Sequence, residues 1–310
     1  MIRVQTAPEF SERLNRASIN KRCYPWDKDV IDWSVPITDE YLYVPEEYSI
    51  LYGTPAWDRL DFKAKSFVTR WEFTQLMRNA GAGEHLLNQA ILAVLHHTDQ
   101  YDPAWRFMLH EVAEECQHMA MFNHWTRLNA DIKTKGLAGD KWGLIASMLT
   151  PFFATKAPVF FWMLTALFEV TGDDMARCQM KNAAGNLHPI CQQMGRAHMI
   201  EEIRHIAFAQ AWMENAIPKM STFQRTLLSE SAERITTQVL RIGFRLPYSS
   251  QIADHVSYAE FKAGIHSEHR RALFNRQITP TINDLKEVGV IRKSAIRAWE
   301  GKGLLQAAAC

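Results

Sequence analysis

The pattern of hydrophobic and polar positions divides the chain into three parts. From about residue 61 to 245, apolar residues recur at helical spacing, with turn-forming stretches at 99–103 (DQYDP), 135–141 (KGLAGDK) and 185–189 (GNLHP). Residues 1–60 are irregular and rich in aromatic residues and proline, and residues 246–310 indicate shorter helices. The pattern predicts an all-α fold in a single domain, 1–310: a helical bundle core with an irregular N-terminal arm packed on it and a C-terminal helical appendage.

The most apolar segment is VFFWMLTALF, residues 159–168. It is shorter than the about 20 residues that span a bilayer, and Pro158 and Glu169 flank it. We therefore expect a buried core helix and no membrane partner. The N-terminus lacks the apolar core of a signal peptide, and the five cysteines are odd in number and scattered, without CxxC spacing. These features favour a soluble, cytoplasmic protein.

The charge balance bears on partners. The formal net charge is +1 and there is no dense run of lysine and arginine, so we expect no nucleic-acid partner.

Two short motifs carry the candidate chemistry. HEVAEECQHMAMF contains Glu115-x-x-His118, and HMIEEIRHIAF contains His198, Glu202 and His205 at steps of four and three. Those steps return to the same face of an α-helix. Two Glu-x-x-His motifs in a helical bundle are typical of a carboxylate-bridged metal pair, in which two further helices each add one glutamate. Cys116, between the first pair, is interpreted as a small buried apolar residue.

The spacing of the helical hairpins selects the two single glutamates. Glu84 lies 31 residues before Glu115, and Glu169 lies 33 residues before Glu202, with a turn-forming stretch near the middle of each interval. Ligands at similar distances from a shared turn meet at one height, so we predict Glu84 and Glu169 as ligands. Glu72 would leave very unequal arms.

Adjacent glutamates leave an alternative open. Glu114 and Glu201 are four residues from the histidines and could replace Glu115 and Glu202. The tighter spacing favours Glu115 and Glu202, and the neighbours are interpreted as surface groups or as groups that support the ligands.

The ligand types indicate the metal. Four carboxylates balance the four positive charges of two divalent ions, which allows burial. Oxygen and imidazole donors without thiolates suit two iron ions, with manganese as an alternative. Iron in such a bundle uses O₂ as co-substrate.

The complete set resembles the non-haem diiron N-oxygenases typified by p-aminobenzoate N-oxygenase. The third histidine, His198, is the distinguishing feature of a set that consists of Glu84, Glu115, His118, Glu169, His198, Glu202 and His205. The resemblance covers about residues 70–210. It implies a ferritin-like four-helix bundle and a cytoplasmic homodimer that converts an amine toward hydroxylamine, nitroso or nitro products in secondary metabolism. No nucleotide or flavin motif is visible in the sequence, so we expect an external electron donor.

Two positions depart from the pattern of that family. The resemblance implies that the aminobenzoate enzyme holds its substrate carboxylate with an arginine and an asparagine. At the corresponding positions this chain has Asn79 and Asp173. An aspartate repels a carboxylate. We therefore predict Asn79 and Asp173 as substrate-binding residues, and a larger or carrier-tethered amine in place of a small free benzoate.

Two other functions use the same ligands. A diiron hydroxylase or desaturase would act on carbon, and a ferritin-like protein would store or oxidise iron. Storage proteins are usually shorter and more polar than this chain, so storage is the less favoured alternative.

Overall fold

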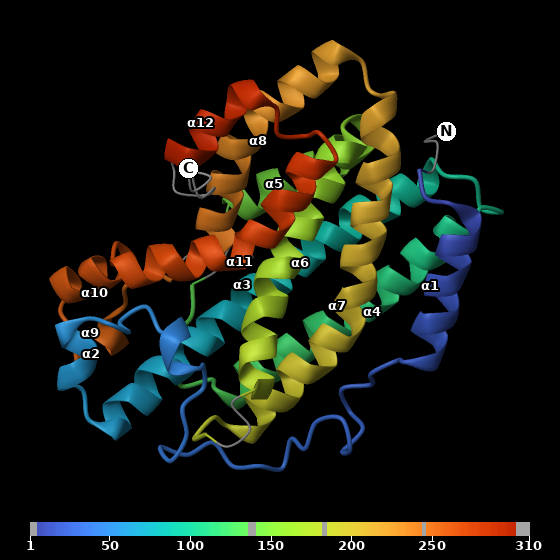
Figure 1. Cartoon of the computed structure of the whole chain (residues 1–310). Helices are drawn as coiled ribbons and strands as arrows, with labels where there is room; N and C mark the ends of the chain where they lie inside the picture. Colours follow the sequence, from blue (N-terminus) through green and yellow to red (C-terminus); the bar gives the residue numbers. More distant parts are fainter. Residues whose placement is uncertain (1–4, 136–140, 182–184, 244–245, 302–310) are drawn as a thin grey trace.

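The computed structural model describes residues 5–135, 141–181, 185–243 and 246–301, and the regular elements in these ranges are helices (Figure 1). One isolated parallel bridge joins Leu42 to Leu187. The all-α prediction is confirmed. The α-helices are α1 (Pro8–Asn20), α2 (Pro55–Arg59), α3 (Phe62–His96), α4 (Pro103–Leu128), α5 (Lys141–Lys156), α6 (Pro158–Lys181), α7 (Pro189–Ala216), α8 (Thr222–Gly243), α9 (Ser250–Ala253), α10 (Tyr258–Ile265), α11 (Glu268–Glu287) and α12 (Lys293–Gly301), with short 3₁₀ helices η1 (Glu46–Tyr48) and η2 (Ile217–Lys219).

Four long helices form the bundle. α3 packs against α4, and α6 packs against α7, so the chain makes two helical hairpins. In Figure 1 the α6–α7 pair lies in front of the α3–α4 pair. α3 is one continuous helix of 35 residues and passes through Gly81-Ala82-Gly83 without a break.

The residues at the N-termini of α4 and α7 explain two of the predicted turns. The Asp102 carboxylate accepts a hydrogen bond from the Ala104 backbone N–H at 2.9 Å, and Pro103 is the first residue of α4. His188 caps α7 in the same way, with Pro189 as its first residue. Proline at this position needs no backbone partner, and the capping side chain satisfies a free N–H group. The turns at 99–103 and 185–189 are therefore confirmed. Of the stretch at 135–141, residues 136–140 lie outside the described residues.

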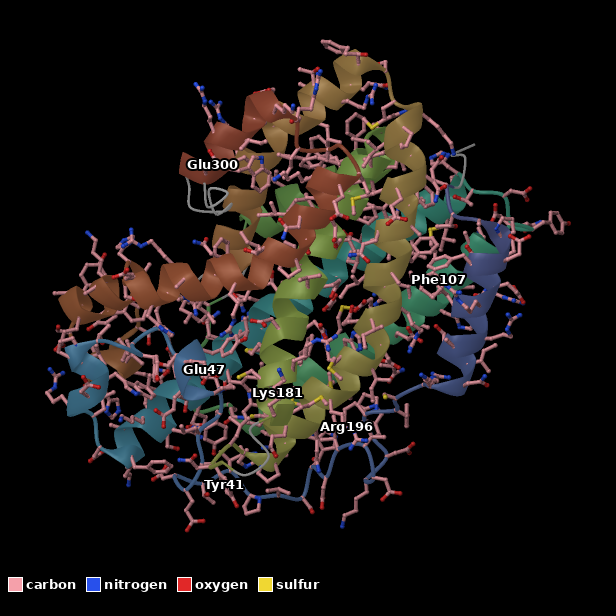
Figure 2. The ribbon with its side chains drawn as sticks, in the orientation of Figure 1. Tyr41, Glu47, Phe107, Lys181, Arg196 and Glu300 are labelled. Carbon is pink, nitrogen blue, oxygen red and sulfur yellow. The ribbon has the colours of Figure 1, made fainter. Side chains whose placement is uncertain are left out.

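The apolar segment 159–168 is part of α6 and is buried, as expected. Trp162 is fully buried and packs on Phe208 and Trp212 of α7, with ring centroids 5.2 and 5.5 Å apart. Figure 2 shows side chains filling the spaces between these helices. Among the described helices, none is by itself long and apolar enough to cross a membrane. Only α5 and α6 taken together reach that composition, and they are bent by 120° at their junction.

The N-terminal arm is less irregular than its sequence indicates, because it begins with the 13-residue helix α1. α1 lies against α4 and α7 (Figure 1). Its buried residues are Ser11, Leu14, Asn15 and Ser18, of which only one is apolar. The segment is polar overall and buries a single large apolar residue, so it lacks the apolar positions that indicate a core helix. The expected irregular structure was wrong for residues 8–20.

The rest of the arm crosses the end of the bundle and is tied to it. The Leu42 N–H donates to the Asn186 carbonyl at 2.7 Å, and the His188 N–H donates to the Leu42 carbonyl at 2.8 Å. The Tyr43 ring stacks on His188, with centroids 5.0 Å apart.

The C-terminal appendage consists of further helices, as the pattern predicted. The longest of them, α11, lies along α6, and α12 packs on α8. The last described helix, α12, extends to Gly301.

Candidate metal centre

The four bundle helices bring the seven predicted ligands into one buried cluster. α3 supplies one glutamate, α4 a glutamate and a histidine, α6 one glutamate, and α7 two histidines and a glutamate. Ligand atoms lie within 4.8 Å of one another in four overlapping groups of three, which together include six of the seven residues. The groups are Glu84–His118–His198, Glu115–His118–Glu202, Glu169–His198–Glu202 and Glu84–Glu115–Glu169.

Two carboxylates lie between the same two imidazoles. The Glu115 oxygens are 2.9 Å from His118 Nδ1 and 2.9 Å from His205 Nδ1. The Glu202 oxygens are 3.2 Å from His118 Nδ1 and 2.9 Å from His205 Nδ1. Each carboxylate thus places one oxygen beside each imidazole, which joins the seventh residue, His205, to the cluster. Such an arrangement suits carboxylates that bridge two cations.

His198 also faces the cluster. Its Nε2 atom is 3.5 Å from Glu202 Oε1 and 3.7 Å from Glu84 Oε1. Its ring lies 4.5 Å from the His118 ring, measured between centroids. A Cβ atom added to Gly172 of α6 would lie 3.7 Å from His198 Cε1, so α6 passes close to this imidazole. The third histidine therefore occupies the face on which the sequence placed it.

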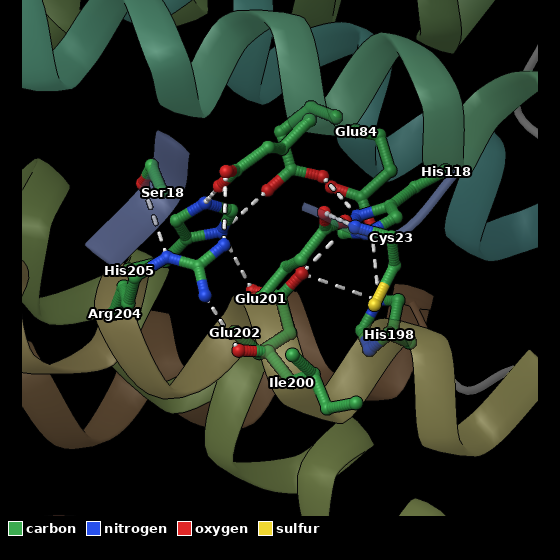
Figure 3. A network of polar contacts seen from close by, with 12 residues as sticks. Ser18, Cys23, Glu84, His118, His198, Ile200, Glu201, Glu202, Arg204 and His205 are labelled. Atoms are coloured by element: carbon green, nitrogen blue, oxygen red, sulfur yellow. Dashed lines mark hydrogen bonds and ion pairs between the residues drawn. The ribbon is translucent and has the colours of Figure 1, made fainter. Parts of the chain in front are cut away.

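The adjacent glutamates Glu114 and Glu201 lie behind the histidines and are buried. Glu201 Oε2 accepts from His118 Nε2 at 3.0 Å (Figure 3). Glu114 Oε2 accepts from His205 Nε2 at 2.8 Å. They contact the ring nitrogens that point away from Glu115 and Glu202. The structure therefore supports the interpretation of Glu114 and Glu201 as supporting groups, while the alternative in which they replace the ligands does not fit.

Burial changes the protonation of the two single glutamates. Loss of solvent, followed by the nearby charges of Glu115 and Glu202, raises the pKa of Glu84 well above its usual range. Burial, followed by the charges of Glu202 and Glu84, raises the pKa of Glu169 well above its usual range. These two carboxyl groups stay protonated unless a cation replaces the protons.

The two central carboxylates behave in the opposite way. Burial favours their neutral form, but the neighbouring histidines outweigh it and hold the pKa of Glu115 and of Glu202 below the usual value. Conversely, burial disfavours charged histidine, but the carboxylates raise the pKa of His118 and His205 well above the usual value. The two imidazolium groups thus compensate the negative charges of the two carboxylates. Divalent cations can provide the same compensation.

The residues fit a pair of divalent cations. Four buried carboxyl groups, those of Glu84, Glu115, Glu169 and Glu202, lie together in the cluster. Buried carboxylates are costly unless positive charges compensate them. The oxygen and imidazole donors suit iron or manganese.

Glu111 is a residue of this region that the sequence reasoning missed. It is fully buried on α4, one turn before Glu115, and neither of its oxygens has a hydrogen-bond partner in the described residues. Burial is the main cause that raises its pKa, to about 8. Its position four residues before a predicted ligand, on the same helix face, was the available signal.

The structure changes the interpretation of the predicted substrate residues. Asp173 is buried, but its Oδ2 atom accepts from Arg177 Nε at 2.6 Å, so its charge is compensated by a neighbour on the same helix. This ion pair weakens the expected repulsion of a carboxylate, and the substrate-binding role of Asp173 stays a prediction. Asn79 is also buried, and its Oδ1 accepts from Gln75 Nε2 at 3.1 Å. Cys116 is exposed, so the prediction of a buried cysteine was wrong.

Comparison with known proteins places the chain in a family. The family described as p-aminobenzoate N-oxygenase AurF matches residues 4–289. Uncharacterized proteins of Mycobacterium bovis (Mb0909) and Mycobacterium tuberculosis (Rv0885) are each 27% identical over 237 residues, which is 71% of this chain. The chain spans 64% of the length of these relatives. Because the family match extends over nearly the whole chain and includes all seven clustered residues, the chain belongs to the p-aminobenzoate N-oxygenase AurF family.

Proposed function

We propose that the chain is an O₂-dependent diiron oxygenase that converts an amine into an N-oxygenated product, in secondary metabolism. The placement of Glu115 and Glu202 between His118 and His205 is the observation that carries this proposal. These two carboxylates and two histidines could together hold two cations. Membership of the AurF family supports amine oxidation as the reaction.

In this proposal the metal ligands are the seven residues of the cluster. Glu115 and Glu202, which lie between the two imidazoles, would hold the ions together with Glu84, His118, Glu169, His198 and His205. When bound, two ferrous ions supply the electrons that activate dioxygen. Manganese would fit the same donors. The proposed reaction would take its electrons from an external donor, since the sequence shows no nucleotide or flavin motif.

The surrounding residues exclude water from one side of the centre. The Phe107 ring lies 6.4 Å from the His205 ring and 4.7 Å from Phe208, measured between centroids, and all three residues are fully buried. Phe107 is labelled on α4 in Figure 2. A dry site strengthens the interactions of charged groups within it. Glu111, with its pKa raised by burial to about 8, holds a proton at neutral pH one turn from Glu115.

The substrate expectation now depends on Asn79. An amide cannot hold a carboxylate in the bidentate way of a guanidinium. We propose that p-aminobenzoate is turned over more slowly than an amine with an amide-linked or carrier-tethered acyl group. Asn79→Arg should increase turnover of p-aminobenzoate relative to the amide-linked amine.

The decisive experiment loads the full chain with ferrous iron anaerobically and adds O₂, a chemical reductant and a panel of aromatic amines. Mass spectrometry of the products should show oxygen added at nitrogen, and Glu115→Ala should abolish this product. A product oxygenated at carbon would support the hydroxylase alternative. A multimeric cage that accumulates iron without product, detected by size-exclusion chromatography and iron analysis, would support storage.

A further inference from the structure

The N-terminal arm reaches the metal centre through two chains of hydrogen bonds. In the first chain, the Cys23 backbone N–H donates to Glu201 Oε1 at 2.9 Å. The other oxygen of that carboxylate, Glu201 Oε2, accepts from His118 Nε2 at 3.0 Å. A backbone group of the arm is thus one carboxylate away from a proposed metal ligand (Figure 3).

The second chain starts five residues earlier in the sequence. Ser18 Oγ, on α1, accepts from Arg204 Nε at 3.0 Å. Another nitrogen of this guanidinium donates to Glu114 Oε1 at 2.9 Å, and Glu114 Oε2 accepts from His205 Nε2 at 2.8 Å. The two chains therefore reach the two histidines that share the bridging carboxylates.

Both chains of hydrogen bonds fix the orientation of an imidazole ring. When Nε2–H donates outward to a carboxylate, the ring is held with Nδ1 facing Glu115 and Glu202, and Nδ1 is free to bind a cation. Glu201 is 1% exposed and Glu114 is 5% exposed, so water does not readily replace these contacts. The orientation of each histidine therefore depends on how its carboxylate is held.

We propose that the N-terminal arm holds His118 and His205 in their metal-binding orientation through Glu201 and Glu114, so that docking of the arm and metal loading stabilise each other. Ser18 and Arg204 act as positioning residues. This inference rests on the proposed metal centre. Because coupling between two sites is reciprocal, metal should protect the arm by the same factor by which the arm strengthens metal binding.

The first experiment replaces the two carboxylates by amides of nearly the same shape. In Glu201→Gln the amide oxygen can still accept from Cys23, but its NH₂ group then faces His118 Nε2 and opposes the required N–H. Glu114→Gln does the same at His205. Anaerobic equilibrium dialysis should show a loss of ferrous iron affinity of about 10- to 100-fold in each variant.

The second experiment tests the arm with a matched pair of serines. Ser18→Ala removes the acceptor of Arg204 Nε, whereas Ser11→Ala makes the same change on the same buried face of α1. Ser11 contacts Thr6, with 2.8 Å between the hydroxyl oxygens, and is not part of either chain. Ser18→Ala should weaken ferrous iron binding by about 5-fold or more, while Ser11→Ala should bind as the wild type does.

The third experiment measures the reverse direction on the wild-type chain. Ferrous iron, added without oxygen, should slow amide hydrogen exchange at Cys23. It should also slow tryptic cleavage after Lys21 and Arg22, which are exposed beside that buried residue. Iron should protect the arm less in Glu201→Gln.

The outcomes separate this inference from the proposed function. If the wild type does not bind two ferrous ions per chain, the metal centre is wrong, and the coupling with it. If the wild type binds iron and oxygenates an amine, the coupling is overturned by either of two results. The first is an equal ferrous iron affinity of Ser18→Ala and Ser11→Ala. The second is amide hydrogen exchange at Cys23 that is the same with and without iron. Unchanged affinity in both Glu201→Gln and Glu114→Gln would overturn the positioning of the histidines.

Discussion

At the scale of single residues, Glu72 is a buried carboxyl group that serves the fold and not the metal centre. Its Oε1 accepts from the Ile50 N–H at 2.8 Å and from Ser49 Oγ at 3.2 Å, which ties the arm to α3. Among the described residues nothing donates to Oε2. Burial raises the pKa of Glu72 to about 7.

This shift predicts how stability depends on pH. Below pH 4.5 the group is protonated in both states, and the folded state carries no penalty. Between about pH 4.5 and 7 the unfolded chain loses the proton while the folded chain retains it, so stability falls as pH rises, by about 3 kcal/mol in total. Glu72→Gln keeps the acceptor and removes the titration. Its stability relative to wild type should therefore increase by that amount between pH 4.5 and 8 in urea denaturation with chelator present.

The exposed Glu40 offers the control for this measurement, since Glu40→Gln should change stability little at any pH. A Glu72→Gln difference that is the same at pH 4.5 and pH 8 would contradict the predicted cost of ionisation.

His198 allows a second test on one residue. It contributes a neutral donor close to Glu202 and Glu84, so His198→Ala should leave the fold intact but lower ferrous iron affinity by about 10-fold. The visible absorption of the cobalt-substituted protein should also shift, because one ligand is lost. His85→Ala, at an exposed position beside Glu84, is the matched control. Identical cobalt spectra and iron affinities for His198→Ala and the wild type would exclude His198 as a ligand.

At the scale of secondary-structure elements, two helical glycines differ in what lies beside them. A Cβ atom on Gly264 of α10 would overlap the backbone carbonyl oxygen of Ile50 in the arm. A Cβ atom on Gly83 of α3 would have no atom within 4 Å. α10 can therefore approach the arm only with glycine, whereas α3 has space beside Glu84.

The two glycines predict opposite effects of one substitution. Alanine in place of glycine favours a helix by about 0.5–1 kcal/mol, so Gly83→Ala should stabilise the protein by that amount. Gly264→Ala should instead destabilise it by about 1–3 kcal/mol, because the arm has to move away. Urea denaturation of the metal-free protein measures both. Equal stabilisation by the two substitutions would show that α10 and the arm are not in close contact.

At the scale of the whole molecule, α5 presents its large apolar side chains outward. Residues Leu144, Ile145, Met148, Leu149, Phe152 and Phe153 are between 42% and 70% exposed. The small residues Gly143, Ala146, Ser147 and Ala154 are on the less exposed side of the same helix. No charged residue lies between Lys141 and Lys156. An apolar face of this kind usually indicates an interaction surface.

We expect a second copy of the chain to cover this α5 face. Six large side chains that are about half exposed provide on the order of 600 Å², near the about 800 Å² that each partner contributes to a stable interface. Two identical uncharged faces can meet about a two-fold axis without opposing charges. Sedimentation should give twice the chain mass of 35.7 kDa. Met148→Glu should produce monomers, whereas Tyr101→Glu, at an exposed position in the α3–α4 turn, should not.

A Met148→Glu protein that stays dimeric would place the interface elsewhere. A wild-type monomer would refute the dimer, and binding of that monomer to phosphatidylglycerol vesicles would identify a lipid surface as the occupant of the α5 face.

The sequence by itself determined the features that depend on neighbouring residues. The helical period, the capping residues and the prolines at positions 103 and 189 specify where α4 and α7 begin. The steps of three and four place His198, Glu202 and His205 on one face. Similar distances from the turns also indicated Glu84 and Glu169, because both hairpins have arms of comparable length.

Only the tertiary structure decided what the neighbouring residues of each motif contact. Glu114 and Glu115 are adjacent, but one accepts from the outer nitrogen of His205 and the other lies between two imidazoles. Successive residues of a helix point about 100° apart, so their roles depend on which helices surround them. The contacts of Ser18 and Cys23 with Arg204 and Glu201 join residues more than 170 positions apart, and no local pattern encodes such pairs.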